Sequence, residues 1–212
     1  LRIGLPIGTT IFVEGSLFIG AALLIARLGA WPASAHLIAI NYSALMFMVP
    51  LGVASAVTTR VGNALGRGEP EAARYAGLIG LLIVLFTQTL SAATMLLIPG
   101  IIVKIYTNDL AITSIAVSLL FYSAIFQYAD GIQICAAGAL RGLKDTVVPM
   151  FINIVAYLLV GLSVGYYLTF NKAMGPAGMW IGMIVGLSIG AVLLMGRFLF
   201  KSSLLIRLKA TE

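Results

Sequence analysis

The sequence carries little charge. Of its 212 residues, 9% are Asp, Glu, Lys or Arg and 61% are hydrophobic, whereas a soluble domain of this length would be about a quarter charged. This shortage excludes a soluble globular domain and indicates an integral membrane protein. The apolar runs are roughly 20 to 30 residues long and lack the short alternating segments of a membrane β-barrel, so we expect an all-α bundle of transmembrane helices.

Cysteine and histidine are almost absent. Cys135 is the only cysteine and His36 the only histidine, which excludes an internal disulfide bond and a metal site built from several thiolates or imidazoles. No P-loop, HExxH motif or Ser–His–Asp set is present, so we expect neither an enzyme nor an organic cofactor. The net charge of +6 comes from Lys and Arg residues scattered among the connections, which argues against a nucleic-acid partner.

Charged residues and Pro/Gly positions divide the sequence into six apolar segments. We expect one six-helix transmembrane domain over residues 1–212, with spans at 3–26, 34–59, 75–103, 110–140, 146–170 and 174–196. Ten of the thirteen Lys and Arg residues then fall on the side of both termini, and this positive-inside bias predicts cytoplasmic termini. The connection from Arg60 to Arg74 is expected to contain a short polar helix at the membrane surface.

Two carboxylates interrupt the apolar segments. Glu14 and Asp130 each lie about a dozen residues from the nearest basic residue, which at about 1.5 Å per residue is near the bilayer midplane. An acid there costs about 2.5–3.5 kcal/mol on insertion scales, so it is normally paired, protonated, ion-bound or open to a wet cavity. We predict that Glu14 and Asp130 bind a coupling cation, with Na⁺ as the candidate metal ion. A permanently protonated, hydrogen-bonded acid is the structural alternative.

Other polar side chains are candidate cation or drug contacts. Gln127 and Gln133 lie about one helical turn on either side of Asp130, which predicts a polar stripe along the fourth span. Asn41 lies in the second span at about the depth of the first-span acid. Asp109, at the outer start of the fourth span, could cap its helix or attract organic cations.

Large flexible and aromatic side chains could form a tolerant substrate pocket. Phe126, one turn before the fourth-span acid, belongs to this set, and Tyr128 is a further possible cation or drug contact. The alternative is that such residues face lipid or neighbouring helices. The other members of this set are Met46, Phe47, Met48 and Phe121.

Glycine recurs every four residues in the sixth span, at Gly178, Gly182, Gly186 and Gly190. Such a ladder permits close contact between two helices. Packing inside the bundle is the expected role. A substrate path and a contact between two copies, as in a homodimerising membrane scaffold, are the alternatives.

Three segments resemble signatures of the MATE (multidrug and toxic compound extrusion) transporters. Residues 60–74 resemble the segment after the second or eighth helix of that family, and residues 35–41 resemble the helix start before it. Residues 138–146 resemble the cytoplasmic turn after the fourth or tenth helix. MATE proteins have twelve helices in two six-helix lobes, and acids on the first and fourth spans resemble the C-terminal lobe of the NorM-like branch. The resemblance therefore implies helices seven to twelve, with an N-terminal lobe as the missing partner.

The resemblance implies a secondary antiporter of the bacterial inner membrane that exports amphipathic organic cations in exchange for Na⁺ or H⁺. Relatives sometimes carry an aromatic hydroxyl, which could help to hold Na⁺, at the position of Phe126. Because phenylalanine lacks that hydroxyl, the resemblance leaves proton coupling open beside Na⁺ coupling. A lipid or lipid-linked oligosaccharide flippase of related architecture is the alternative, although a cationic lumen would suit it better. The sequence opens without Met inside an apolar run, which favours part of a longer polypeptide; two copies could otherwise pair as a homodimer.

Overall fold

The computed structural model describes residues 4–209, and these residues form helices joined by short turns. Six stretches are long and apolar enough to cross a membrane, so the predicted all-α, six-span class is confirmed. The predicted first span began at residue 3, which lies outside the described residues. The elements are α1 (Gly4–Ala26), α2 (Ala30–Gly66), α3 (Pro70–Leu97), α4 (Pro99–Lys104), α5 (Leu110–Gly142), α6 (Val147–Asn153), η1 (Ile154–Leu162), α7 (Ser163–Tyr166), η2 (Tyr167–Asn171) and α8 (Pro176–Lys209), where η marks a π-helix.

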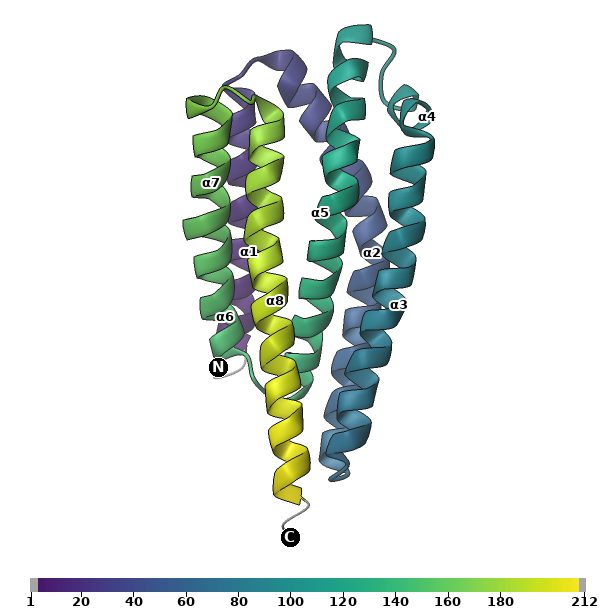
Figure 1. Cartoon of the computed structure of the whole chain (residues 1–212), viewed down its shortest axis with the longest axis vertical. Helices are drawn as coiled ribbons and strands as arrows, with labels where there is room; N and C mark the ends of the chain where they lie inside the picture. The colour runs from purple at the N-terminus through teal and green to yellow at the C-terminus, as the bar shows by residue number, and fades with distance from the viewer. Residues whose placement is uncertain (1–3, 210–212) are drawn as a thin grey trace.

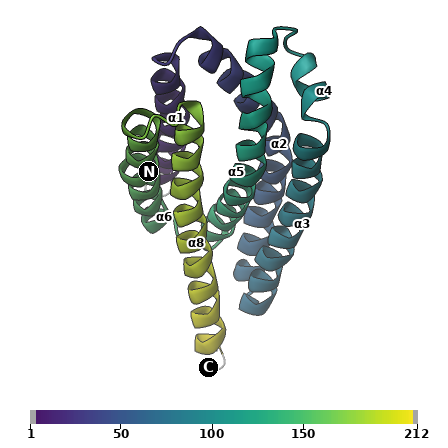
Figure 2. The same cartoon turned by 45° about the horizontal axis from the view of Figure 1, so that its top comes forward.

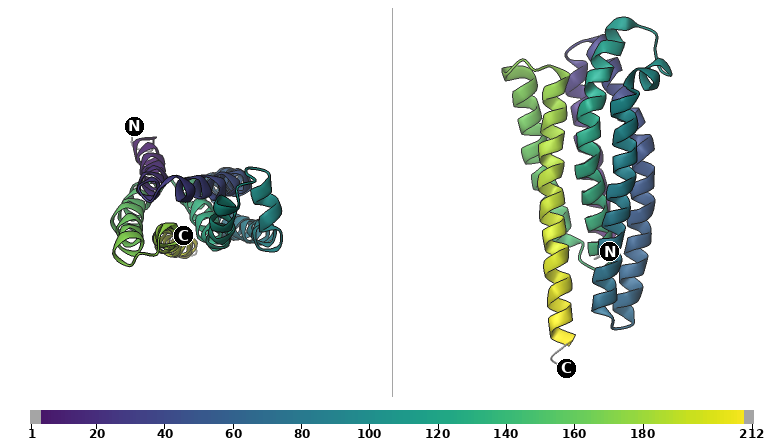
Figure 3. Two further views of the ribbon diagram at one scale, coloured as in Figure 1. Left: turned by 90° about the horizontal axis from the view of Figure 1, so that it is seen from above. Right: turned by 45° about the vertical axis from the view of Figure 1, so that its right-hand side comes forward.

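The long helices run side by side, and the start of α1 and the end of α8 point toward the same end of the bundle (Figure 1). We call this the terminal end. Figure 2 shows α1 and α6 to α8 on one side of the molecule, with α2 to α5 on the other. Viewed along the axis, α8 of the first group lies next to α5 of the second (Figure 3), and the two helices pack together extensively.

The buried apolar residues form two clusters, one above the other along the axis. The outer cluster takes residues 13–25 of α1, 116–129 of α5 and 179–187 of α8. The terminal cluster takes residues 57–64 of α2, 135–143 around the end of α5, and the later part of α8. On α5, Asp130 lies between the outer cluster, which ends at Ala129, and the terminal cluster, which starts at Cys135. Glu14 follows Val13, the first outer-cluster residue of α1.

Proline and glycine set several helix boundaries differently from the sequence expectation. The third span ends at Leu97 and a separate short helix starts at Pro99, because proline disfavours helical geometry in the residue before it. The expected surface helix between Arg60 and Arg74 is wrong. Instead α2 continues to Gly66 and α3 starts at Pro70, with Gly68 in the left-handed region (φ 72°) making the tight turn between them.

The glycine ladder of α8 packs against the fifth span of the same chain. A Cβ atom added at Gly182 would lie 2.3 Å from Cα of Gly165, and one at Gly186 would lie 2.8 Å from Cα of Gly161. At Gly178 it would lie 2.6 Å from the Thr169 nitrogen. The two backbones approach this closely only because the ladder lacks side chains. Packing inside the bundle is therefore confirmed, and this ladder is not free for a contact with a second copy.

An ion-pair cluster ties the end of α5 to α8. The Arg197 Nε donates to Oδ2 of Asp145 at 2.6 Å, and Lys201 Nζ lies 3.2 Å from the same oxygen. Asp145 is buried while its two partners are partly exposed. The cluster fixes the turn after α5 against the terminal half of α8.

Candidate functional site

The two intramembrane acids face one cavity. Glu14 from the middle of α1 and Asp130 from α5 both line a space of about 260 Å³. The rest of the wall is mostly apolar and is formed by Phe18, Ile40, Ser43, Ala44, Phe47 and Phe126. Two carboxylates in an apolar wall make this space suited to a positively charged occupant.

Glu14 also lines a second, smaller space on the terminal side. This cavity has a volume of about 40 Å³, enough for one or two water molecules, and its polar lining includes Gln133, Arg141, Asp145 and Thr146. The charges of Arg141 and Glu14 interact. Glu14 therefore stands between the larger cavity and a polar region that leads toward the turn after α5.

The two acids share the wall of one cavity, so their negative charges oppose each other when both are ionised. Asp130 is 5% exposed, Glu14 is half-buried, and their charges interact. The Oδ1 atom of Asp130 has no hydrogen-bond partner among residues 4–209. Two ionised carboxylates in a poorly solvated space are unfavourable unless a proton or another cation is held there. Across those same residues no three His, Cys, Asp or Glu side chains gather as a metal site, so any metal ion here would need neutral oxygen ligands as well.

The comparisons with known proteins agree with this architecture. A protein-family model described as MatE matches residues 6–167. The chain belongs to the MATE family. It is 53% identical to a probable multidrug resistance protein NorM of Xanthomonas axonopodis pv. citri, over 93% of this chain and 43% of that protein. It is 44% identical to the multidrug resistance protein PmpM of Pseudomonas aeruginosa, over 92% of this chain and 42% of that protein.

The MATE chain described here spans less than half the length of these relatives. A crystal structure of a MATE protein in a bent conformation has the same fold, with a TM-score of 0.91 at 19% identity. That alignment covers 99% of this chain and 46% of the solved one. The six helices thus correspond in extent and fold to about half of a solved MATE protein.

The polar residues expected to form one stripe along α5 are all buried, but their side chains turn to different neighbours. The Gln127 side chain accepts a hydrogen bond from Ser91 Oγ at 2.9 Å, and its backbone oxygen accepts one from Gln88 Nε2 at 2.8 Å. Gln133 instead lines the small cavity beside Glu14. Each step of three residues rotates a helix by about −60°, so two such steps separate Gln127 from Gln133 by about 120°.

Three further candidates lie outside both cavities. Asn41 is exposed and its Oδ1 accepts a hydrogen bond from the Tyr106 hydroxyl at 3.1 Å. The cavity face of α2 carries positions 40, 43, 44 and 47, so Asn41 has the wrong helical direction. The Tyr128 hydroxyl donates to Thr89 at 3.0 Å. Asp109 caps α5, accepting from the backbone nitrogens of Ala111 at 2.8 Å and of residue 112 at 3.3 Å.

The aromatic and methionine candidates divide between cavity, core and surface, and Met46 is partly buried against the outer cluster. Phe126 and Phe47 line the acid cavity, and the Phe126 ring packs edge-on against Phe18 and Trp180. Met48 and Phe121 are more than half exposed on the isolated chain. Only the first pair can contribute to a pocket that includes the acids.

The sequence analysis did not single out Ser43 or Arg141 as site residues. Ser43 lines the acid cavity, and its Oγ shares a 2.5 Å hydrogen bond with Ser123 Oγ across to α5. The signal available in advance was spacing, because Ser43 lies three residues after Ile40 and four before Phe47 on the cavity face. Nothing in the sequence indicated that Arg141 extends back toward Glu14.

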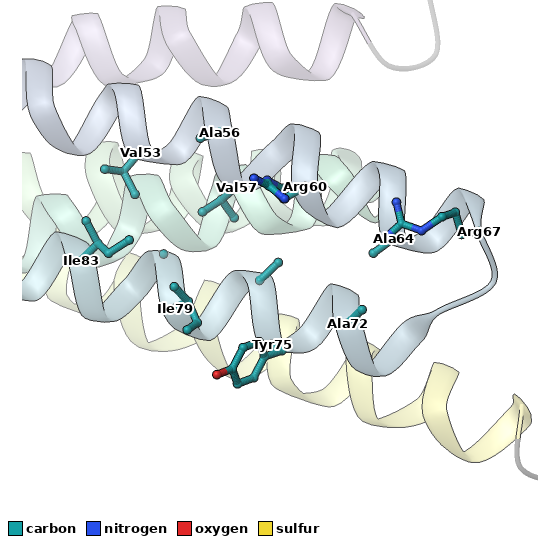
Figure 4. Close-up of a pocket in the computed structure, with 12 residues that line it drawn as sticks. Val53, Ala56, Val57, Arg60, Ala64, Arg67, Ala72, Tyr75, Ile79 and Ile83 are labelled. Carbon is teal, nitrogen blue, oxygen red and sulfur yellow. The ribbon is translucent and has the colours of Figure 1, made fainter.

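A larger groove of about 470 Å³ lies between α2 and α3, and neither of the two intramembrane acids lines it. Figure 4 shows Val53, Val57 and Ile83 along it, with Arg60 and Arg67 toward the turn between the helices. No carboxylate lines it. This groove therefore lacks the chemistry expected of a cation-coupling site, and the smaller acid cavity remains the functional candidate.

Proposed function

We propose that this chain is the C-terminal six-helix lobe of a secondary antiporter that exports amphipathic organic cations in exchange for Na⁺ or H⁺. The observation that carries the proposal is the convergence of Glu14 and Asp130 on one mostly apolar cavity. The naming of relatives as multidrug resistance proteins supports the export of drug-like compounds. These relatives are about twice as long as this chain, which supports an N-terminal lobe as the partner that completes the transport cavity.

The coupling mechanism follows from competition for a small number of negative charges. A cation entering from outside neutralises the repulsion between Glu14 and Asp130 and so favours the conformation in which it binds best. Bound drug, itself a cation, is then released outward. The ion can shift the two-lobe equilibrium only as far as its affinities for the two conformations differ.

The composition of the cavity wall favours organic cations over lipid phosphates. Pockets for drug-sized ligands usually have volumes of about 300–1,000 Å³ and are largely apolar. The acid cavity of this lobe reaches about 260 Å³, and an opposing lobe would enlarge it. No basic residue lines this cavity, whereas a flippase for phosphate headgroups would require positive charge there.

The positive-inside distribution of Lys and Arg supports a plasma-membrane protein with cytoplasmic termini.

The test is drug efflux from vesicles that contain the full-length transporter under an imposed Na⁺ or H⁺ gradient. We expect Glu14→Gln and Asp130→Asn each to reduce gradient-driven efflux at least tenfold, an effect of about 1.4 kcal/mol or more. Glu71→Gln is the matched control, because Glu71 is an exposed acid in the first turn of α3. Efflux at wild-type rates from both acid variants would show that the pair is structural, and the gradient that drives the wild type identifies the ion.

A further inference from the structure

The groove between α2 and α3 has the dimensions of a lipid chain. Its wall is almost entirely aliphatic, and Val57 packs at its floor against Gly80, where an added Cβ atom would overlap the valine. Along α2 the groove extends from Val53 to Arg67, about 21 Å at 1.5 Å per residue. One leaflet contributes about 15 Å of hydrocarbon, half of the usual 30 Å or so. The groove is therefore long enough for a fatty-acyl chain with its headgroup.

The polar residues of the groove lie where a headgroup would be. Residues 37–59 of α2 carry no charged side chain, a stretch of about 35 Å that slightly exceeds the hydrocarbon core. Arg60 is the first charge beyond it, at the terminal end. On the facing wall, Tyr75 begins the uncharged part of α3 and is 68% exposed (Figure 4). Tyrosine is enriched at the membrane–water interface, so both residues mark the same level.

The charge of Arg60 is not compensated within the chain. The other arginine of the groove is, because Nε and Nη2 of Arg67 donate to Oε2 of Glu69 at 3.0 and 2.9 Å. Arg60 is exposed and forms no ion pair with any carboxylate of residues 4–209. No acidic side chain lines the groove. A single free guanidinium thus stands at the end of an apolar channel.

The groove also faces away from the cavity that a second lobe would complete. On α2 the acid cavity is lined by Phe47, whereas Ala56 lines the groove. These positions are nine residues apart, which at about 100° per residue places them on opposite sides of the helix, about 180° apart. A lobe that closes over the acids therefore leaves the groove side of α2 toward the bilayer.

We propose that this groove binds one anionic phospholipid of the leaflet at the terminal end. The acyl chain lies along the aliphatic wall, and the phosphate binds the guanidinium of Arg60, whose fork of N–H donors matches phosphate oxygens. Tyr75 presents its hydroxyl from the facing wall. Basic pockets between transmembrane helices recognise anionic headgroups in this way. The groove shares no lining residue with the acid cavity, so the inference does not depend on cation coupling.

The experiment titrates the purified full-length transporter with phosphatidylglycerol or phosphatidylcholine and follows lipid binding by native mass spectrometry. We expect the wild type to bind phosphatidylglycerol about fivefold more tightly, and Arg60→Gln to lose this preference, since one basic residue near anionic lipid contributes about 1 kcal/mol. Lys144→Gln is the matched control, because Lys144 is an exposed basic residue at the same end outside the groove. Its affinity should stay within twofold of wild type.

A second variant tests the apolar wall without changing any charge. Ala56 is exposed and lines the groove, so Ala56→Phe fills the space that the acyl chain would occupy and disturbs no buried contact. We expect its affinity for phosphatidylglycerol to fall at least fivefold. In lipid-free detergent its melting temperature should equal that of the wild type. Added phosphatidylglycerol should then stabilise the wild type and Lys144→Gln more than the two groove variants.

Three results overturn the proposal. The first is equal affinity of the wild type for the two lipids, and the second is phosphatidylglycerol affinity within twofold of wild type in Arg60→Gln. The third is an Ala56→Phe variant that melts well below the wild type without lipid, which would show that protein from the other lobe covers the groove. None of these results decides the proposed function, because Glu14→Gln and Asp130→Asn test coupling separately.

Discussion

Substituting alanine for one glycine of the α8 ladder should destabilise the bundle severely. A Cβ atom at Gly182 would lie 2.3 Å from both Cα and the nitrogen of Gly165, and 2.6 Å from the Gly161 oxygen. All three are backbone atoms, so no side chain can rotate away and the whole fifth span must shift. Overpacking of a well-packed interior costs about 1–3 kcal/mol, and contact with backbone places Gly182→Ala at about 3 kcal/mol or more.

Gly196→Ala provides a matched control on the same helix. No atom lies within 4 Å of a Cβ at that position, and the residue is exposed. Replacing glycine by alanine inside a helix stabilises it by about 1 kcal/mol when nothing clashes. The two substitutions are chemically identical, so their predicted difference of about 4 kcal/mol isolates the packing of α8 against the fifth span.

The assay is reversible unfolding in mixed micelles with increasing SDS, followed by tryptophan fluorescence. Trp180 is a suitable reporter because its side chain is completely buried in the outer cluster. Equal stability of Gly182→Ala and Gly196→Ala would refute the close backbone contact, and with it the conclusion that the ladder packs inside the chain.

Three smaller effects are expected elsewhere. Asp145→Asn leaves two basic groups without their buried carboxylate, and because those groups are partly exposed we expect a loss of about 1–2 kcal/mol in the same unfolding assay. Ser43→Ala removes the hydrogen bond to Ser123 and should cost about 1 kcal/mol, while Ser43→Thr, which retains the hydroxyl, should lose less. The hydrogen bond from Arg67 lowers the pKa of Glu69, so its contribution is present above the ordinary carboxyl pKa of about 4.3 and is lost as pH falls through the lower folded-state value. Melting temperatures of Glu69→Gln and wild type should therefore differ slightly at pH 7 and low salt, and should converge once the pH falls below the lowered folded-state pKa of Glu69; a difference that persists in strong acid contradicts this.

The sequence by itself determined the membrane class, the six spans and the two acids of the candidate site. These features are local: an apolar run long enough to cross a bilayer, and a carboxylate in its middle, are recognisable without knowing any neighbour. The segments around Arg60 and Gly138 were also sufficient to indicate the family, which the MatE match confirmed. Asp109 as a helix cap was foreseeable for the same reason, since capping involves only adjacent residues.

Only the tertiary structure decided which polar residues face the acids. Periodicity shows which side chains share a helix face, but the direction of that face depends on how neighbouring helices pack. This is why Asn41 and Gln127, both polar and close in depth to the acids, bond elsewhere, while Ser43 and Gln133 line the cavities. A cavity lined by residues of α1, α2 and α5 is a long-range property, and no local pattern contains it.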